Sequence, residues 1–184
     1  LSNNFRSLKS SEPFRALELG SGPGSNLGLL ARSNFQIWCI DGSATAIHQS
    51  KQQLNAEGLL GSLKGATIGQ LTEVEFQQTF FDLIIDIEVL AHNSFEVASK
   101  ISKKAINALK PGGKFFGKSF SDFTTVDGDE ISYNYFDCNE RVFAGMGPIR
   151  ISTKEDIFQL FESHNTTVRI LERDERHFDN GAIV

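Results

Sequence analysis

The sequence predicts an α/β fold with a mostly parallel central sheet and helices on both faces. Between residues 14 and 120, short apolar segments alternate with segments whose apolar residues recur at helical spacing, which is the pattern of βαβ units. Residues 80–86 are also nearly continuously apolar, as expected for a central parallel strand buried on both faces. Both observations favour one sheet built from crossover connections.

The composition indicates one globular domain, residues 1–184. The chain is 40% hydrophobic and 22% charged, which excludes a disordered protein, and no apolar run approaches the about 20 residues of a membrane span. A net charge of −5 gives no overall basic field, so we expect neither a nucleic-acid partner nor a membrane, and the oligomeric state is left open. With only two cysteines, Cys39 in an apolar run and Cys138 in a polar one, a cytoplasmic, reducing location is expected.

The elements follow in order along the chain. Strands are predicted at residues 15–19, 35–40, 66–68 and 80–86, with helices at 25–32 and 44–57 between the first three. A helix at 95–109 is expected to end at the Pro111-Gly112-Gly113 turn, because proline cannot continue it, and a fifth strand should follow at 114–118.

The remaining chain is less regular. Residues 121–151 show neither a helical nor a strand period, which indicates a long loop or small insertion that covers the substrate. Residues Ser152 to Glu155 have the pattern of a capping box, which predicts a helix that begins there and ends near residue 163. A sixth strand is predicted at 166–171. The absence of an initial Met and a final Ile183-Val184 that resembles the opening of a strand suggest truncated termini.

Three alternate glycines, Gly20, Gly22 and Gly24, lie where the first strand runs into a helix. Glycine is expected at such a turn when a ligand must approach the backbone closely or when φ must be positive. The carboxyl ends of parallel strands are where nucleotides bind. The alternative is a tight strand-to-helix turn without a ligand.

Asp41 ends the second strand, 21 residues after Gly20. A carboxylate there can accept hydrogen bonds from both hydroxyls of a ribose. The alternative is that it caps the following helix, a role for which Ser43 competes.

Together these features resemble the class I S-adenosylmethionine-dependent methyltransferases, of the small-molecule type. The resemblance covers residues 14–120 and rests on four motifs in the family's order and spacing. These are Glu18-Leu19-Gly20-Ser21-Gly22-Pro23-Gly24, the acidic Asp41, the apolar strand ending at Asp86, and Leu109-Lys110-Pro111-Gly112-Gly113. The resemblance implies a Rossmann-like methyltransferase fold and S-adenosyl-L-methionine as the cofactor.

Site residues are implied position by position. The glycine turn with Ser21 would line the methionine and ribose, Glu18 would order the amino group, and Asp41 would hold the ribose. Gly42 and Ser43 would flank the adenine; Gln70-Leu71 stand where the family often has an acidic residue, which weakens that contact. The methionine side would be closed by Asp86, Ile87 and Glu88, although Glu88 could equally be an exposed acid.

On the acceptor side, the resemblance implies methyl transfer to oxygen or nitrogen of a small molecule. His92, six residues after Asp86, is the candidate general base, because imidazole takes up protons near neutral pH; a solvated loop histidine is the alternative. Candidate substrate residues are Phe120, Tyr133 and Arg141, with Arg150 nearby in sequence; the arginines could instead form surface ion pairs, and no metal site is assigned.

Two other functions remain open at this point. An NAD(P)-dependent oxidoreductase would want Gly-x-Gly-x-x-Gly, and here Ser25 stands where the third glycine belongs. A non-catalytic, methyltransferase-like scaffold module would keep the same turn and Asp41 without turnover.

Overall fold

The computed structural model describes residues 12–122, 124–126, 129–130, 136–137, 145–162, 166–168 and 172. The chain forms two compact units. The first comprises Leu1–Asp86 with Asn107–Phe116, and the second comprises Ile87–Ile106 with Gly117–Val184.

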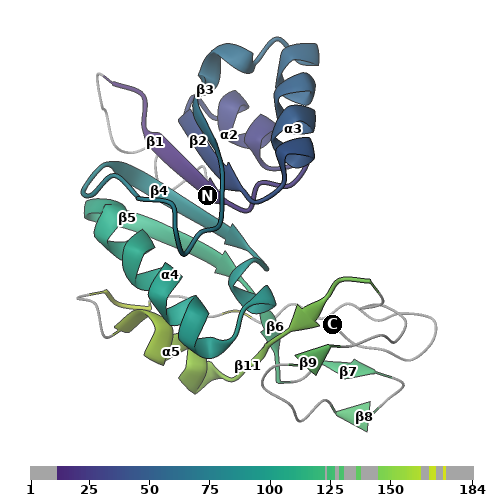
Figure 1. The fold of residues 1–184 in the computed structure, drawn as a ribbon. Helices are drawn as coiled ribbons and strands as arrows, with labels where there is room; N and C mark the ends of the chain where they lie inside the picture. Colours follow the sequence, from purple (N-terminus) through teal and green to yellow (C-terminus); the bar gives the residue numbers. More distant parts are fainter. Residues whose placement is uncertain are drawn as a thin grey trace. The chain divides into compact units, whose positions relative to one another are not determined.

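The first unit is built on a five-stranded sheet in the order β3-β2-β1-β4-β5 (Figure 1). β1 (Arg15–Leu19) pairs in parallel with β2 (Gln36–Asp41) and with β4 (Phe81–Ile87), and β2 pairs in parallel with β3 (Leu63–Ile68). Leu19, the last residue of β1, is in register with Ile40 and with Asp86. The carboxyl ends of three strands therefore meet at one edge, and the predicted Rossmann-like α/β fold is confirmed.

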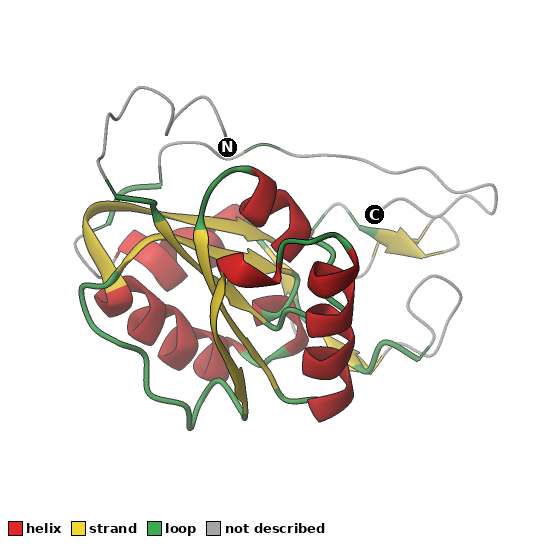
Figure 2. Ribbon diagram, turned by 90° about the horizontal axis from the view of Figure 1, so that it is seen from above, coloured by secondary structure: helices red, strands yellow, loops and turns green. Residues whose placement is uncertain are grey.

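Two helices of the first unit, α2 (Leu27–Arg32) and α3 (Ala44–Ala56), pack beside β2 (Figures 1 and 2). The strand residues Ala16, Ile37 and Cys39 are at most 1% exposed. Cys39 is thus a core residue, as the sequence predicts, and burial raises the pKa of its thiol to about 11.

α2 begins at Leu27, two residues later than the sequence predicts. Asn26 occupies the N-cap position without a capping hydrogen bond from its side chain. Its amide instead donates to the Glu18 carboxylate at 2.7 Å, and residues 25–26 form a turn before the helix starts. β3 begins three residues earlier than expected, directly after the short turn η1 (Leu60–Ser62).

The Pro-Gly-Gly segment is part of a strand, which corrects the prediction of a separate turn. α4 (Phe95–Ala108) ends one residue before its predicted end, and β5 (Leu109–Lys118) starts at once. Gly112 has φ +78°, and a Cβ at Gly113 would lie 2.9 Å from the carbonyl oxygen of Lys110. The glycines therefore allow β5 to begin with a kink instead of delaying it.

The second unit carries short strand pairs within the described part of the predicted insertion. β6 and β11 pair in parallel, whereas β7 with β8 and β9 with β10 pair antiparallel. Their bounds are β6 (Phe120–Ser121), β7 (Thr125–Val126), β8 (Asp129–Glu130), β9 (Phe136–Asp137), β10 (Pro148–Ile149) and β11 (Ile151–Ser152). The insertion is therefore not a structureless loop where the structure describes it.

α5 (Lys154–Phe161) follows β11, and its capping box differs from the predicted one. The Thr153 hydroxyl accepts from the backbone N–H of Asp156 at 3.1 Å, and the Asp156 carboxylate accepts from the N–H of Thr153 at 2.8 Å. The box lies one residue later than predicted because Ser152 still belongs to β11.

Beyond α5, residues 166–168 are not in a strand, which contradicts the start of the predicted sixth strand. The rest of that strand and the last residues lie outside the described residues, as do Tyr133, Cys138 and Arg141.

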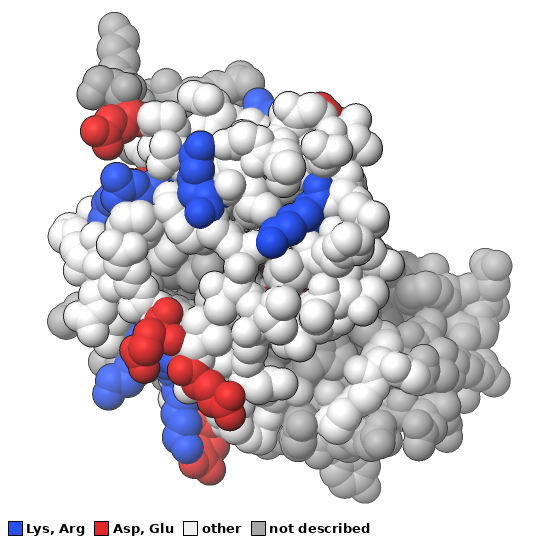
Figure 3. Space-filling model, turned by 45° about the horizontal axis from the view of Figure 1, so that its top comes forward, with Lys and Arg blue, Asp and Glu red and all other residues white. Residues whose placement is uncertain are grey.

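Two surface properties complete the fold. Within the described ranges, no helix combines the length and apolar character that crossing a bilayer requires. On the face shown in Figure 3, the described Lys and Arg side chains stand as separate groups instead of one continuous basic patch.

Candidate cofactor site and the loop after β4

The glycine turn adopts the backbone that only glycine takes easily. Gly20, Gly22 and Gly24 have φ values of +60°, +52° and +97°. A Cβ at Gly24 would lie 2.8 Å from Cβ and 3.0 Å from Cα of Ser50 on α3, so a side chain there would collide with that helix. A Cβ at Gly22 would meet no atom within 4 Å among the described residues. The turn is therefore packed against α3 at Gly24 and open at Gly22, as close approach of a ligand requires.

Asp41 faces this turn. Its Oδ2 accepts from the backbone N–H of Gly22 and its Oδ1 from that of Ser43, both at 2.8 Å. The Ser43 hydroxyl accepts from the N–H of Ala46 at 3.2 Å and so caps α3. Because Ser43 takes the capping role, the Asp41 carboxylate is held in place by two backbone donors. Each carboxylate oxygen retains a further lone pair for hydroxyl donors.

Glu18 projects into the same region and is only 2% exposed. Its Oε1 accepts from Asn26, whereas its Oε2 has no hydrogen-bond partner among the described residues. Burial raises the pKa of this carboxyl to about 7; the hydrogen bond from Asn26 opposes the rise, and the Asp41 charge adds to it. A buried acceptor without a donor is uncommon in folded proteins, so Oε2 is suited to a donor from a ligand.

The ends of β2 and β3 also come together. The backbone N–H of Gly69 donates to the carbonyl of Asp41 at 3.0 Å. A Cβ at Gly42 would lie 3.4 Å from Nε2 of Gln70, so the Gln70 amide lies against Gly42. Leu71 follows as a half-buried residue. The predicted adenine-side residues are therefore neighbours, and the Gln70 amide is placed beside the same strand end as Asp41.

Asp86, on β4, is in register with Leu19 on β1 and is 3% exposed. The next two predicted residues, Ile87 and Glu88, open the second unit. Glu88 has φ +68°, and its carboxylate accepts from Nζ of Lys118 at 2.5 Å. Glu88 is therefore a half-buried ion-pair partner instead of a free exposed acid, and its role toward a cofactor stays a prediction.

Comparison with known proteins places this geometry in a family. Residues 16–113, just over half of the chain, match the family described as "Methyltransferase domain". The chain belongs to this methyltransferase family. The match runs from β1 into β5 and includes the glycine turn, Asp41 and Asp86. A search of curated protein sequences found no match.

Solved structures with the same fold share little sequence with this methyltransferase-family chain. A SAM-dependent methyltransferase from Methanosarcina mazei superposes with a TM-score of 0.75 at 16% identity, over 95% of this chain and 90% of the other. A SAM-dependent methyltransferase from Leishmania major gives 0.66 at 18% identity, over 99% and 67%. The [4+2]-cyclase SpnF gives 0.63 at 19% identity, over 89% and 56%. These structural similarities show that the chain shares the fold of these proteins.

The cofactor of this family member is S-adenosylmethionine, and the observed residues fit it. Oε2 of Glu18, which has no partner among the described residues, would suit a cationic amino group, and the Asp41 carboxylate, fixed by Gly22 and Ser43, would suit a pair of ribose hydroxyls. The open side of Gly22 leaves room beside the backbone. Sequence reasoning missed Asn26, whose only signal is a short polar residue two positions after the last glycine of the turn.

In the second unit, two predicted acceptor-side residues lie together. The ring of His92 packs edge-on against the ring of Phe120, with centroids 6.1 Å apart. Phe120 is 5% exposed, so most of its ring is already buried by the protein. The predicted surface alternative for Arg150 is wrong, because this side chain is 1% exposed.

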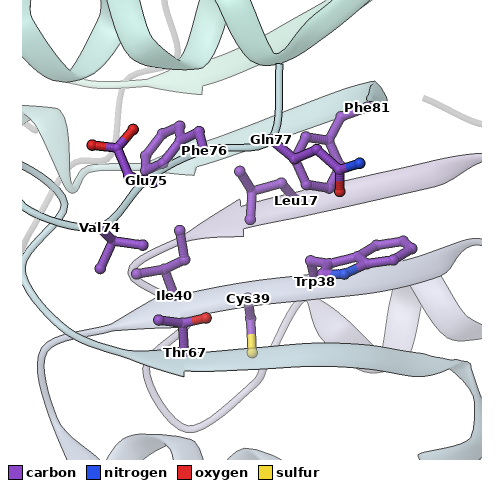
Figure 4. Close-up of a pocket in the computed structure, with 10 residues that line it drawn as sticks. All are labelled: Leu17, Trp38, Cys39, Ile40, Thr67, Val74, Glu75, Phe76, Gln77 and Phe81. Atoms are coloured by element: carbon purple, nitrogen blue, oxygen red, sulfur yellow. The ribbon is translucent and has the colours of Figure 1, made fainter. Parts of the chain in front are cut away.

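A cavity of about 120 Å³ lies elsewhere in the first unit (Figure 4). It lies between the sheet and the segment that connects β3 to β4, with Leu17, Trp38 and Phe76 among its lining residues. Its lining includes none of the glycine-turn residues and not Asp41. The cavity is therefore separate from the candidate cofactor site.

Proposed function

We propose that this protein transfers a methyl group from S-adenosylmethionine to oxygen or nitrogen of a small-molecule acceptor. The observation that carries the proposal is the Asp41 carboxylate, held by Gly22 and Ser43 toward the glycine turn. The same proposal includes two further points: residues 1–184 act as one domain, and residues 121–151 cover the acceptor.

Three polar residues around the glycine turn have distinct tasks in this proposal. Asp41 binds the ribose hydroxyls, Glu18 receives the amino group on Oε2, and Gln70 donates to the adenine edge. When bound, the cofactor supplies an electrophilic methyl group on a sulfonium. The chain then has to orient the acceptor and exclude water, since aligned displacement needs no covalent catalyst.

His92 takes the acceptor's proton in this proposal, where the acceptor is a hydroxyl or a protonated amine. Its Nδ1 lies 3.0 Å from the carbonyl oxygen of Pro148. A carbonyl only accepts, so Nδ1 carries the hydrogen and the lone pair of the neutral ring is on Nε2. Nε2 is thus the atom that removes the proton.

A small acceptor is supported by charge. With a net charge of −5, the chain lacks the field that attracts nucleic-acid backbones. The buried free thiol of Cys39 supports a reducing compartment, for which we propose the cytoplasm.

Calorimetric titration with S-adenosylhomocysteine tests the cofactor assignment. We expect micromolar affinity, and Asp41→Ala should weaken it by about 1 to 3 kcal/mol through loss of charge-assisted hydrogen bonds. Glu96→Ala, which removes an exposed carboxylate on α4, is the control and should leave the affinity unchanged. Equal affinities for wild type and Asp41→Ala would contradict the proposed ribose contact.

A panel of small phenols, carboxylic acids and amines with labelled S-adenosylmethionine tests turnover. Label should move to at least one acceptor, and His92→Ala should slow that transfer. Tight cofactor binding without transfer to any acceptor would instead favour the scaffold function.

A further inference from the structure

Arg150 lies between β10 and β11 and is 1% exposed, although a guanidinium is always charged. Burying a charge is costly unless hydrogen bonds replace its water. The hydrogen-bond partners of Arg150 therefore show which segments its side chain holds in place.

The guanidinium bonds to the loop that carries His92. Nε donates to the carbonyl of Asn93 at 3.2 Å, and Nη2 donates to the carbonyl of Leu90 at 3.3 Å. Nη1 donates to the hydroxyl of Ser152 at 2.7 Å. The backbone N–H of Arg150 adds a bond of 2.6 Å to the carbonyl of Ala91. Three carbonyls within four successive residues are thus bound from one position, 57 to 60 residues away for the side-chain bonds.

The same segment holds the imidazole ring. Pro148, two residues before Arg150, provides the carbonyl that faces Nδ1 of His92. The ring therefore stays oriented only while the backbone on either side of His92 keeps its place relative to Pro148. Arg150 fixes that backbone through Leu90 and Asn93.

We propose that Arg150 is a positioning residue: it holds the loop around His92 so that Nδ1 stays protonated toward Pro148 and Nε2 remains the proton acceptor. This inference rests on the proposed function for its catalytic meaning, in which His92 is the base. The positioning itself is a property of the protein without cofactor or acceptor, so it can be tested separately.

Lysine cannot replace arginine in this arrangement. The guanidinium presents its donors in a rigid planar fork, and here three different nitrogens bond to three different acceptors. An ammonium group concentrates its donors on one nitrogen and cannot reach Leu90, Asn93 and Ser152 together. Arg150→Lys therefore keeps the charge while releasing part of the loop.

The experiment is nitrogen-15 NMR of the histidine rings, which distinguishes the two tautomers of neutral imidazole. The His92 signals are assigned by their loss in His92→Ala. In the wild type we expect His92 with the hydrogen on Nδ1. In Arg150→Lys we expect a mixture in which a substantial population carries the hydrogen on Nε2, while His48 on α3 is unchanged.

Arg32→Lys is the matched control. It makes the same substitution at an arginine whose side chain is exposed and forms an ion pair with Glu57. It should leave the His92 signals unchanged. A folded Arg150→Lys protein whose His92 tautomer is that of the wild type would overturn the proposal. So would a wild-type His92 with the hydrogen on Nε2.

If Arg150→Lys does not fold, Ser152→Ala decides the question. It removes the acceptor of Nη1 and should shift His92 in the same direction by a smaller amount. An unchanged His92 in folded Ser152→Ala would overturn the proposal.

Kinetics connect the positioning to the reaction. For an acceptor that the wild type methylates, Arg150→Lys should lower kcat by roughly 10- to 100-fold, which is less than the full contribution of a general base, about 100- to 10,000-fold, with KM for S-adenosylmethionine unchanged. A lowered cofactor affinity with unchanged kcat would count against positioning. Should the wild type bind no S-adenosylhomocysteine, the proposed function fails, whereas the tautomer result still stands by itself.

Discussion

The glycine turn and the His92 loop are both built around fixed polar groups, but they are assembled differently. In the turn, Asp41 bonds to Gly22 and Ser43, which lie 19 and 2 residues away in the sequence. In the loop, Arg150 and Pro148 reach backbone and ring atoms that lie 56 to 60 residues away. The glycine turn is therefore held by residues that are near in the sequence, whereas the His92 loop is held by residues that are far away in the sequence.

The two regions also differ in whether their buried ionisable side chains have hydrogen-bond partners for every polar atom. Glu18 has one carboxylate oxygen without a partner among the described residues, whereas each nitrogen of the Arg150 side chain donates a hydrogen bond. An unpartnered buried oxygen fits a ligand that is still to bind. A bonded guanidinium fits a structural task. In the proposed function, Glu18 would hold a ligand, whereas Arg150 holds other residues of the protein.

The largest expected effect concerns the turn. Gly24→Ala should lower the free energy of unfolding by about 2 to 4 kcal/mol, because the new Cβ meets Ser50 and the residue has positive φ. Urea unfolding measures this change. Gly58→Ala is the control, since Gly58 has φ +69° but open space around its Cβ, and should cost only about 1 to 2 kcal/mol. Equal costs at both positions would show that contact with α3 does not matter.

The next effect is a pH dependence at Glu18. The pKa of this carboxyl is about 7 in the folded protein against 4.5 as the reference value, so the folded state holds a proton that the unfolded state releases between these values. The wild type should therefore lose up to about 3 kcal/mol of stability relative to Glu18→Gln as pH rises from 4.5 to 7. Unfolding measured at several pH values gives this difference, and a pH-independent difference would contradict the burial of a titrating Glu18.

The same carboxyl should make cofactor binding depend on pH. As pH rises through about 7, Glu18 loses its proton and attracts an ammonium group more strongly, so affinity for S-adenosylhomocysteine should increase in the wild type. In Glu18→Gln this increase should be absent. Calorimetry at pH 6 and 8 separates the two; parallel pH profiles would remove Glu18 from the amino-group contact.

The smallest effect concerns Glu88 in the second unit. Glu88→Gly relieves the strain of φ +68° but removes the ion pair with Lys118, and the two changes should cancel to within about 1 kcal/mol. Lys118→Ala loses only the ion pair and should be the less stable variant in thermal unfolding. The reverse order would indicate that the Glu88 side chain supports the loop by more than this pair.

The sequence predicted the first unit well because its signals are local. β1 was predicted with its observed bounds, and the turn glycines have the positive φ values that the alternate spacing suggested. The capping box was misplaced because a distant partner changed a local preference. Pairing of Ser152 with Ser121 makes Ser152 part of β11 and shifts the capping box to Thr153.

The acceptor-side residues were only partly predictable for the same reason. His92 and Phe120 were each singled out, but nothing in the sequence places them in contact. Arg150 was interpreted as a surface ion pair, since arginine is rarely buried, yet its partners are two backbone carbonyls and a serine hydroxyl, which carry no sequence signature.

By itself, the sequence determined the order of the first five strands and the helices between them, the glycine turn and the carboxylate at the end of β2, because periodicity, backbone preference and residue type act over short spans of chain. The tertiary structure alone decided which oxygen of Glu18 has no partner among the described residues, which ring nitrogen of His92 faces the carbonyl of Pro148, and which groups Arg150 bonds to. These outcomes depend on burial and on hydrogen-bond partners from distant segments, which exist only once the chain has folded.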